Sequence, residues 1–432
     1  MSHRHDRDHA MQPQCRSRAG AGRGPVLRHA FAAGMLAVCF GLSPLSQAAQ
    51  ADSIGDFQKI VDDYLAERGD AESISGLAAY VSLGDPGPGL EFFAGQTAKT
   101  GGVPMSGETL FEIGSNTKGF TGALILALEA EGKLDIDQTV GDWLPLYPAW
   151  KDVSIRDLLN MVSGIPTYSE SMVLSRLWVT DPERHYTLED LIDYAYPSAT
   201  VDLPPTKGYF YSNTNYVLAG MIAEKASGMP YKQLLEEKLF RRAGLNDIYY
   251  EPVELPADVL DRMASGYFDN PECGLYEPDC TEAVLAPLIG RDMRTDDLSW
   301  AGPAGGIVST PRELVRWIRA VFAGKVLPQE QLEELMSLVS TRTGKPIDEV
   351  TADDPRGFGL GLVQLFRPEL GKLWFYEGET LGYRMAFFYS PEADIVIAVA
   401  ANSQPDGKED QIGPLLAKLF DVAKQAKSAN GG

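Results

Sequence analysis

Ser115 and Lys118 stand three residues apart just before the long apolar segment Phe120–Ala130. Positions i and i+3 share one face of a helix, so the two side chains can touch if this segment is helical. A serine hydroxyl is a weak nucleophile that needs an adjacent base, and a lysine becomes a base when burial lowers its pKa. Taken alone, the spacing also describes a capping serine followed by a surface lysine. Because the segment that follows is too apolar for a surface helix, we expect Lys118 to be buried and Ser115 to be a nucleophile.

A second polar group lies in the run Tyr209-Phe-Tyr211-Ser-Asn213-Thr-Asn215. Tyr211 can exchange a proton with Ser115 if a nearby Lys118 charge lowers its pKa from about 10. Asn213 can donate hydrogen bonds to a substrate amide and accept them from it. The alternative is that this segment has only a structural role, as a helix cap with an aromatic residue that packs in the core.

Histidine usage limits the other chemistries. Four of the five histidines lie within the first 29 residues, which leaves His185 as the one histidine of the remaining chain. A histidine-rich metal site is therefore excluded, and a Ser-His-Asp triad would have to use His185. No G-x-S-x-G nucleophile elbow accompanies it. His185 stands beside a predicted helix start at Thr187, so we expect a surface histidine.

The first 51 residues read as a signal peptide. Several arginines precede the apolar run Phe31–Leu45, and the small-residue pattern Ala49-Gln50-Ala51 precedes Asp52. A membrane anchor is the alternative, but the apolar run is short and is interrupted by Pro44. We therefore expect an exported protein, periplasmic or secreted, with no integral membrane segment after cleavage.

The net charge and the cysteine content limit which partners and metals the protein can bind. The net charge is −22, and residues 1–51 hold six Lys+Arg and two Asp+Glu, so the mature chain carries −26. Such an acidic protein repels phosphate backbones, which argues against nucleic acid as a partner. Cys273 and Cys280 remain after cleavage, and in an oxidising compartment they predict a local disulfide. A zinc site would need further ligands nearby, so we expect no metal.

The elements that must position these residues fall into three stretches. We expect a helix over Ile54–Arg68 and strands over Leu77–Ser82 and Glu91–Phe93. Helices and loops then run to about residue 300. Further strands follow, and then a helix: Leu360–Phe366, Leu373–Tyr376, Tyr383–Tyr389, Ile395–Ala400 and Ile412–Lys424.

Short turns between the late strands indicate hairpins and hence an antiparallel sheet. We therefore predict an α/β (α+β) fold, an antiparallel sheet flanked by helices and built from both ends of the chain. Residues 52–114 and 301–432 would form this domain, and residues 115–300 a mostly helical inserted domain. Three S/T-x-x-D/E boxes mark helix starts, namely Ser154 with Asp157, Thr187 with Asp190, and Thr310 with Glu313.

Together these segments resemble the family of class C β-lactamases and D-alanyl-D-alanine carboxypeptidases (penicillin-binding-protein-like), which has a β-lactamase/transpeptidase-like fold. The resemblance covers about residues 54–425. Besides Ser115-x-x-Lys118 and Tyr211-Ser-Asn213, its order and spacing extend through three more segments: Ile155-Arg-Asp-Leu-Leu-Asn-Met-Val-Ser-Gly-Ile165, Pro303-Ala-Gly-Gly-Ile-Val-Ser-Thr310 and Gly378-Glu-Thr-Leu-Gly-Tyr383.

The resemblance implies a role for each matching residue. Ser115 would form an acyl-enzyme, and Lys118 with Tyr211 would pass the proton to the leaving group. Tyr211 would then activate the deacylating water. The backbone N–H groups of Ser115 and Glu379 would form the oxyanion hole, with Gly378 beside them. The resemblance implies no metal and no organic cofactor.

The chain departs from the family at the third motif and at the usual histidine. The third family motif, Lys or His followed by a variable residue and Gly, reads Tyr376-Glu377-Gly378 here. A literal Lys99-Thr-Gly101 precedes the nucleophile, which is the wrong order, so we interpret it as unrelated. Met161 stands where the family usually has histidine. At the third motif, either Tyr376 or Arg384 on the next strand would contact a substrate carboxylate.

We therefore expect a serine hydrolase that acts on small peptide-like amides, resembling a D-alanyl-D-alanine carboxypeptidase. An esterase of the same family is the first alternative, because the third-motif cation is missing. A protein that captures peptidoglycan fragments or β-lactams without turnover is the alternative from another class. Retention of Ser115, Lys118, Tyr211 and Asn213 argues against it, since a binder needs no proton shuttle.

Overall fold

The computed structural model describes residues 44–430 apart from 85, 86, 88, 200, 202–204, 252 and 271–283, with side chains over residues 54–429. Two sequence predictions fall outside these limits. Residues 1–43 of the expected signal peptide are not described, and residues 44–51 form the start of a helix. The predicted disulfide between Cys273 and Cys280 also lies outside the described residues, and it stays a prediction.

A nine-stranded antiparallel sheet forms the frame of the molecule, in the order β2-β1-β13-β12-β11-β10-β9-β7-β8. Its two N-terminal strands join the C-terminal ones directly, because β1 pairs along its length with β13. The strands are β1 Gly76–Ser82, β2 Leu90–Gly95, β7 Leu338–Ser340, β8 Pro346–Ile347, β9 Arg356–Phe358, β10 Val363–Arg367, β11 Gly371–Glu379, β12 Arg384–Ser390 and β13 Ile395–Ala401.

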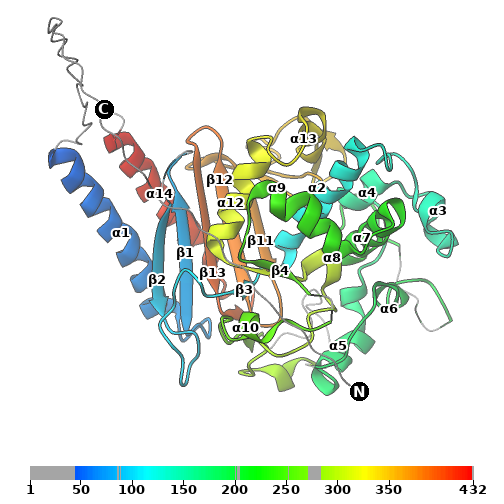
Figure 1. Cartoon of the computed structure of the whole chain (residues 1–432), viewed down its shortest axis with the longest axis horizontal. Coiled ribbons are helices and arrows are strands. Elements are labelled where there is room, and N and C mark those ends of the chain that lie inside the picture. Colours follow the sequence, from blue (N-terminus) through cyan, green and yellow to red (C-terminus); the bar gives the residue numbers. More distant parts are fainter. Residues whose placement is uncertain are drawn as a thin grey trace, which may run out of the picture. The chain divides into compact units, whose positions relative to one another are not determined.

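Helices cover both faces of this sheet, and the strand sequences reflect it. Along β13 every residue is buried, so the strand is an uninterrupted apolar run rather than an alternating one. Helices α1 (Pro44–Arg68) and α14 (Ile412–Asn430) run side by side along one face, as Figure 1 shows. Their apolar side chains and those of the sheet, including Phe57, Leu77, Val399 and Leu416, form one of two cores.

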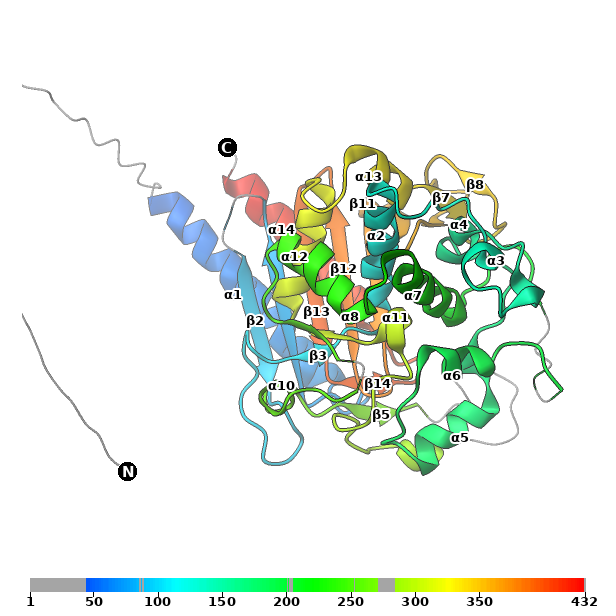
Figure 2. The same ribbon diagram turned by 45° about the vertical axis from the view of Figure 1, so that its right-hand side comes forward.

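The larger core lies on the opposite face, among the remaining helices (Figure 2). At its centre α2 (Thr117–Ala130) is buried from Thr117 to Leu128, as its apolar sequence predicts. The other helices are α3 Val140–Trp143, α4 Ile155–Leu159, α5 Met172–Thr180, α6 Leu188–Asp193, α7 Asn213–Ser227, α8 Tyr231–Leu234, α9 Arg241–Ala243, α10 Ala257–Leu260, α11 Gly302–Gly305, α12 Pro311–Phe322 and α13 Gln329–Leu335.

Two small sheets complete the fold. Strands β3 (Phe111–Glu112), β6 (Ile307–Ser309) and β4 (Ile248–Tyr250) pair antiparallel, and β3 leads directly into the turn that carries Ser115. Strands β5 (Tyr267–Asp269) and β14 (Ser403–Pro405) pair in parallel. None of the helices in the described part of the chain combines the length and apolar character of a membrane span.

The predicted fold class is confirmed, and so are the three helix starts. Ser154, Thr187 and Thr310 each accept a hydrogen bond from the backbone N–H three residues on. The predicted strand over Leu360–Phe366 begins three residues late, at Val363. Gly361 has φ +108°, and a Cβ there would lie 2.4 Å from the carbonyl oxygen of Lys118, so the chain bends around α2 before it becomes a strand.

The predicted division into two domains remains a prediction. The described residues belong to one compact unit, without a separate boundary at 114/115 or 300/301. The sheet nevertheless draws its strands from before residue 96 and after residue 337, as expected for a frame built from both ends of the chain.

Candidate active site

Ser115 lies in a one-turn 3-10 helix, Gly114–Asn116, between β3 and α2. Asn116 fixes this turn, since its side-chain nitrogen donates to the carbonyl oxygens of Ile113 (2.8 Å) and Met385 in β12 (2.7 Å). Gly114 has φ +50°, a conformation that glycine adopts without steric cost. The nucleophile candidate is therefore held against the central sheet by its own turn.

Lys118 lies on the first turn of α2 with no solvent exposure. Its Nζ is 2.9 Å from Ser115 Oγ and donates to the carbonyl oxygen of Ala304 over 2.8 Å. Burial lowers the pKa of Lys118 well below its ordinary value, because an ammonium loses its hydration there. A neutral amine keeps a lone pair, which can accept the proton of Ser115.

Tyr211 lies in the loop before α7, and its hydroxyl is 2.6 Å from Ser115 Oγ. The expectation that a Lys118 charge lowers its pKa is wrong. Burial raises the pKa of Tyr211, and the same burial favours the neutral form of Lys118. The Lys118 Nζ also lies over the ring, 4.8 Å from its centre. Tyr211 is therefore a neutral phenol at rest, a proton donor before it is an acceptor.

Strand β11 brings Gly378 and Glu379 against the turn of Ser115. A Cβ on Gly378 would lie 2.6 Å from the backbone nitrogen of Ser115, and one on Gly114 would lie 2.5 Å from that of Glu379. Thr380 N donates to Tyr383 O, and antiparallel pairing alternates, so the Glu379 N–H points away from β12. The backbone segments that carry the two expected oxyanion donors, the N–H groups of Ser115 and Glu379, are thus in contact, because Gly114 and Gly378 have no side chains.

Tyr376 lies two residues earlier on β11, on the same face as Gly378. Its side chain is 4% exposed, and its hydroxyl donates to the hydroxyl of Tyr211 over 3.3 Å. Tyr376 is therefore joined to Ser115 through Tyr211. The sequence indicated a contact with substrate for this residue, and it did not reveal this contact with Tyr211.

Arg384 does not supply a charge to the site. It is fully buried, and its guanidinium pairs with Glu72 over 2.9 Å and with Asp410. The alternative in which Arg384 reads a substrate carboxylate is therefore wrong. Residues alternate along a strand, and Arg384 faces the side of the sheet that α1 and α14 cover.

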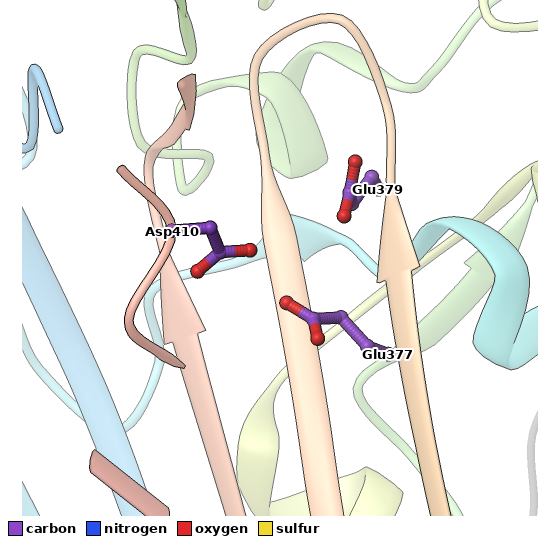
Figure 3. A group of neighbouring side chains, drawn as sticks. All are labelled: Glu377, Glu379 and Asp410. Atoms are coloured by element: carbon purple, nitrogen blue, oxygen red, sulfur yellow. The ribbon is translucent and has the colours of Figure 1, made fainter. Parts of the chain in front are cut away.

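The same side of the sheet holds a cluster of carboxylates, Glu377, Glu379 and Asp410 (Figure 3). Their oxygens lie within 4.8 Å of one another, the one such group of possible metal ligands among the residues that the structure describes. Burial raises the pKa of Glu377, and the Asp410 charge raises it further. Arg384 already contacts this cluster, so it is explained as an ion-pair network behind β11.

Asn213 is the first residue of α7 and is half-buried. Its side-chain nitrogen donates to Ser169 Oγ over 3.0 Å, and its backbone N–H donates to Thr167 Oγ1 over 3.1 Å. Sequence reasoning missed these two hydroxyl residues, which no spacing pattern links to Asn213. They orient the amide that we expected to meet substrate.

Two residues that the sequence analysis interpreted as unrelated to the site make other contacts. His185 is exposed, and its Nδ1 lies 3.3 Å from Asp297 Oδ2. Lys99 is exposed, with its Nζ over the ring of Tyr267 at 4.3 Å. Sequence reasoning also missed the Ala304 carbonyl that holds Lys118, although Ala304 lies in the family-like segment Pro303–Thr310.

Curated proteins similar to this chain include two bacterial examples. Penicillin-binding protein 4* of Bacillus subtilis (strain 168) is 28% identical over 309 residues, which are 71% of this chain and 64% of that protein. A D-aminopeptidase of Brucella anthropi is 29% identical over 219 residues, 51% of this chain and 37% of that protein. The chain thus spans less than two thirds of either relative.

A solved structure extends the similarity to three dimensions. The D-amino acid amidase from Ochrobactrum anthropi SV3, complexed with D-phenylalanine, superposes with a TM-score of 0.70 at 25% identity. The match covers 87% of this chain and 99% of that one. The sequence pattern of the family described as Beta-lactamase matches residues 61–421, which include the Ser115 turn, Lys118, Tyr211 and β11. The chain belongs to the beta-lactamase family of serine hydrolases.

Proposed function

We propose that this chain hydrolyses small amides through an acyl-serine formed on Ser115. The observation that carries the proposal is the position of Ser115 Oγ, within 2.9 Å of a buried lysine nitrogen and 2.6 Å of the hydroxyl of the half-buried Tyr211. An arrangement of nucleophile, base and acid within hydrogen-bond reach is what acyl transfer requires.

Ser115, Lys118 and Tyr211 share the bond making and the proton transfers of the reaction. Ser115 Oγ attacks the amide carbon while the neutral Lys118 amine accepts its proton. The carbon–nitrogen bond then breaks as Tyr211 gives its proton to the leaving nitrogen, and Lys118 returns a proton to Tyr211. In the second half water attacks the acyl carbon and gives a proton to Tyr211, which passes its own proton to the neutral Lys118. The bond between the acyl carbon and Ser115 Oγ then breaks, and Lys118 gives that proton to Oγ.

The negative charge on the former carbonyl oxygen needs donors throughout. The backbone N–H groups of Ser115 and Glu379 are the candidates, because Gly114 and Gly378 let their two chains touch. One such donor is typically worth about 10²–10³ in rate.

The substrate class follows from the third motif. Where the family usually has Lys or His, this chain has the neutral Tyr376, and Arg384 is held in ion pairs on the other side of β11. A free terminal carboxylate has no evident partner at either position. We therefore favour amides of D-amino acids or short D-configured peptides with neutral ends over a D-alanyl-D-alanine carboxypeptidase activity. A relative named D-aminopeptidase and a solved structure named D-amino acid amidase support this preference.

An esterase would use the same groups, and a missing carboxylate anchor suits neutral esters equally well. A fluorophosphonate and a substrate panel separate these possibilities. Ser115 should be the one residue labelled, and Ser115→Ala should lose both labelling and turnover. Labelling that persists in Ser115→Ala would refute the proposal, while labelling without turnover of D-amino-acid amides, esters or cephalosporins would favour the binding protein.

A matched variant tests the substrate class. Tyr376→Lys restores the family cation, and a hydrogen bond to a charged group is worth about 1.5–3 kcal/mol. We expect kcat/KM for a free D-alanyl-D-alanine terminus to rise about 10- to 150-fold relative to a neutral amide. An unchanged ratio would mean that this position does not read the carboxylate.

We also propose that the enzyme works outside the cytoplasm, after removal of residues 1–51. Protein recovered from the periplasm or medium should begin at Asp52, and Cys273 and Cys280 should be disulfide-bonded. A chain retained in the cytoplasm with its first 51 residues intact would contradict this.

A further inference from the structure

The chain on both sides of Tyr211 is held by one residue, Met161. Its carbonyl oxygen accepts a hydrogen bond from the Phe210 N–H over 2.9 Å. Its thioether sulfur accepts one from the Ser212 N–H over 3.3 Å. Met161 therefore fixes the peptide between Tyr209 and Phe210 through its backbone, and the peptide between Tyr211 and Ser212 through its side chain.

Met161 is itself held firmly. It has φ +66°, a left-handed conformation that is sterically disfavoured for residues with a Cβ and is found at functional sites. Its backbone N–H donates to Leu158 O, and its side chain is fully buried. The side-chain nitrogen of Asn215 donates to Leu158 O over 3.0 Å and lies 3.7 Å from the sulfur. The sulfur therefore cannot shift without disturbing the start of α7.

The chemistry of the sulfur gives this contact its weight. Ser212 is fully buried, so its N–H has no water to turn to if the sulfur is removed. A thioether is a weak acceptor, but a hydrocarbon is none at all. An unpaired buried N–H would turn the peptide that precedes Ser212, and that peptide carries Tyr211, whose hydroxyl must stay 2.6 Å from Ser115 Oγ.

We propose that Met161 is a positioning residue for the reaction at Ser115, and that its sulfur fixes the Tyr211 hydroxyl through Ser212. The inference rests on the proposed roles of Ser115 and Tyr211. It explains why this chain tolerates methionine where its family usually has histidine, because an imidazole nitrogen can also accept a hydrogen bond.

A purely structural role is the competing explanation, since Met161 also belongs to the larger core. Met263 is a matched control, because it lies in the same core with 1% exposure and is not part of the site. Replacing either methionine by leucine keeps the volume and removes the sulfur. A core filler loses stability on this change, while a positioning residue loses rate.

The experiment compares Met161→Leu, Met161→His and Met263→Leu. The readouts are melting temperature, kcat and KM for a p-nitrophenyl ester, and the rate of fluorophosphonate labelling of Ser115. We expect Met161→Leu to lower kcat and the labelling rate about tenfold with KM unchanged, the size of one lost hydrogen bond. Met263→Leu should stay within about twofold, and Met161→His should recover most of the rate.

A double-mutant cycle with Tyr211→Phe separates positioning from general damage. Met161→Leu should have little further effect once the Tyr211 hydroxyl is gone. A full tenfold loss in that background, or an equal loss in Met263→Leu, would overturn the inference. If Met161→Leu does not fold, Met161→His tests the inference in its place. A tenfold loss of kcat in Met161→His at an unchanged melting temperature would then overturn the inference. Ser115→Ala, which tests the proposed function itself, identifies a failure at that level.

Discussion

Removing the Tyr376 hydroxyl is the perturbation that tests the proton shuttle most directly. Tyr376→Phe keeps the ring, which packs edge-on to Phe358 with centroids 6.1 Å apart, and deletes the donor that contacts Tyr211. Burial raises the pKa of Tyr376 well above its ordinary value, so this hydroxyl stays protonated and remains a donor. The change should therefore leave the fold intact and weaken only the support of the Tyr211 oxygen.

The size of the effect follows from the charge that Tyr211 carries in the transition state. A neutral hydrogen bond is worth about 0.5–1.5 kcal/mol and one to a charged group about 1.5–3 kcal/mol. Since 1.36 kcal/mol is a factor of ten in rate, a tyrosinate predicts roughly a 10- to 150-fold loss, and a neutral phenol at most about tenfold. The 3.3 Å separation is long for a hydroxyl pair, so we expect about tenfold.

The pH dependence gives a second measure with a fixed sign. The hydrogen bond from Tyr376 lowers the pKa of Tyr211, against burial, which raises it. Without that bond the pKa of Tyr211 rises further, so any rate increase that depends on its ionisation moves to higher pH. The fluorophosphonate labelling rate at Ser115, measured from pH 6 to 10, covers the range below the raised pKa of Tyr211, so Tyr376→Phe should label more slowly at every pH in it.

Tyr209→Phe is the control, because the Tyr209 ring also packs on Phe358, at 5.6 Å, and loses a hydroxyl in the same way. Labelling of Tyr376→Phe within twofold of wild type at every pH would refute the reasoning. An equal loss in Tyr209→Phe would assign the effect to packing around Phe358.

Five further substitutions test the site and its surroundings. Lys118→Ala and Tyr211→Phe should each lower turnover about 10²–10⁴-fold, whereas His185→Ala should be silent, and a large loss in the latter would revive a triad. Burial raises the pKa of Glu112 to about 8 from 4.5, so its contribution to stability is complete below pH 4.5 and is lost as the pH rises to about 8. Urea unfolding should thus show Glu112→Gln gaining on wild type over that interval, and a constant difference would refute the raised pKa. Arg384→Met should cost about 3–5 kcal/mol of stability, since it removes the buried cation that pairs with Glu72 and Asp410, and a wild-type melting temperature would contradict this.

The part of the site that the sequence predicted is the part set by local geometry. Ser115 and Lys118 meet because a helix brings positions i and i+3 together, and the apolar helix that follows made burial of Lys118 foreseeable. Tyr211 is 96 residues away from Ser115, and no periodicity connects them. Only its resemblance to a family pattern placed it beside the nucleophile.

The expectations that failed concern direction and environment. Arg384 is on the predicted strand, but whether it faces substrate or α14 depends on the register of β12, which one residue of slip would reverse. The expected fall in the pKa of Tyr211 considered the charge of Lys118 but not the burial of Tyr211, which raises this pKa. The contacts of Met161 depend on a positive φ that no sequence rule assigns to methionine.

The fold class was predictable because two kinds of pattern agreed. Buried strands read as short apolar runs between turn residues, and capping boxes marked three helix starts that the structure contains. Strand order was less accessible, since the small pairs of β3 with β6 and β5 with β14 join segments with no local link.

The pairing of β1 with β13 determines when, during synthesis, the candidate active site can form. Leu77 pairs with Ala401, and the Ser115 turn leans on Glu379, so nearly the whole chain must be made before either contact can form. Contacts between such distant residues slow folding, because a long loop must close before the pairing stabilises it. When Ser115 and Lys118 of a nascent chain have left the ribosome, β11, the strand that would stabilise an oxyanion, has not yet been made. Under the proposed mechanism, hydrolysis at Ser115 therefore cannot begin before β11 has taken its place in the sheet.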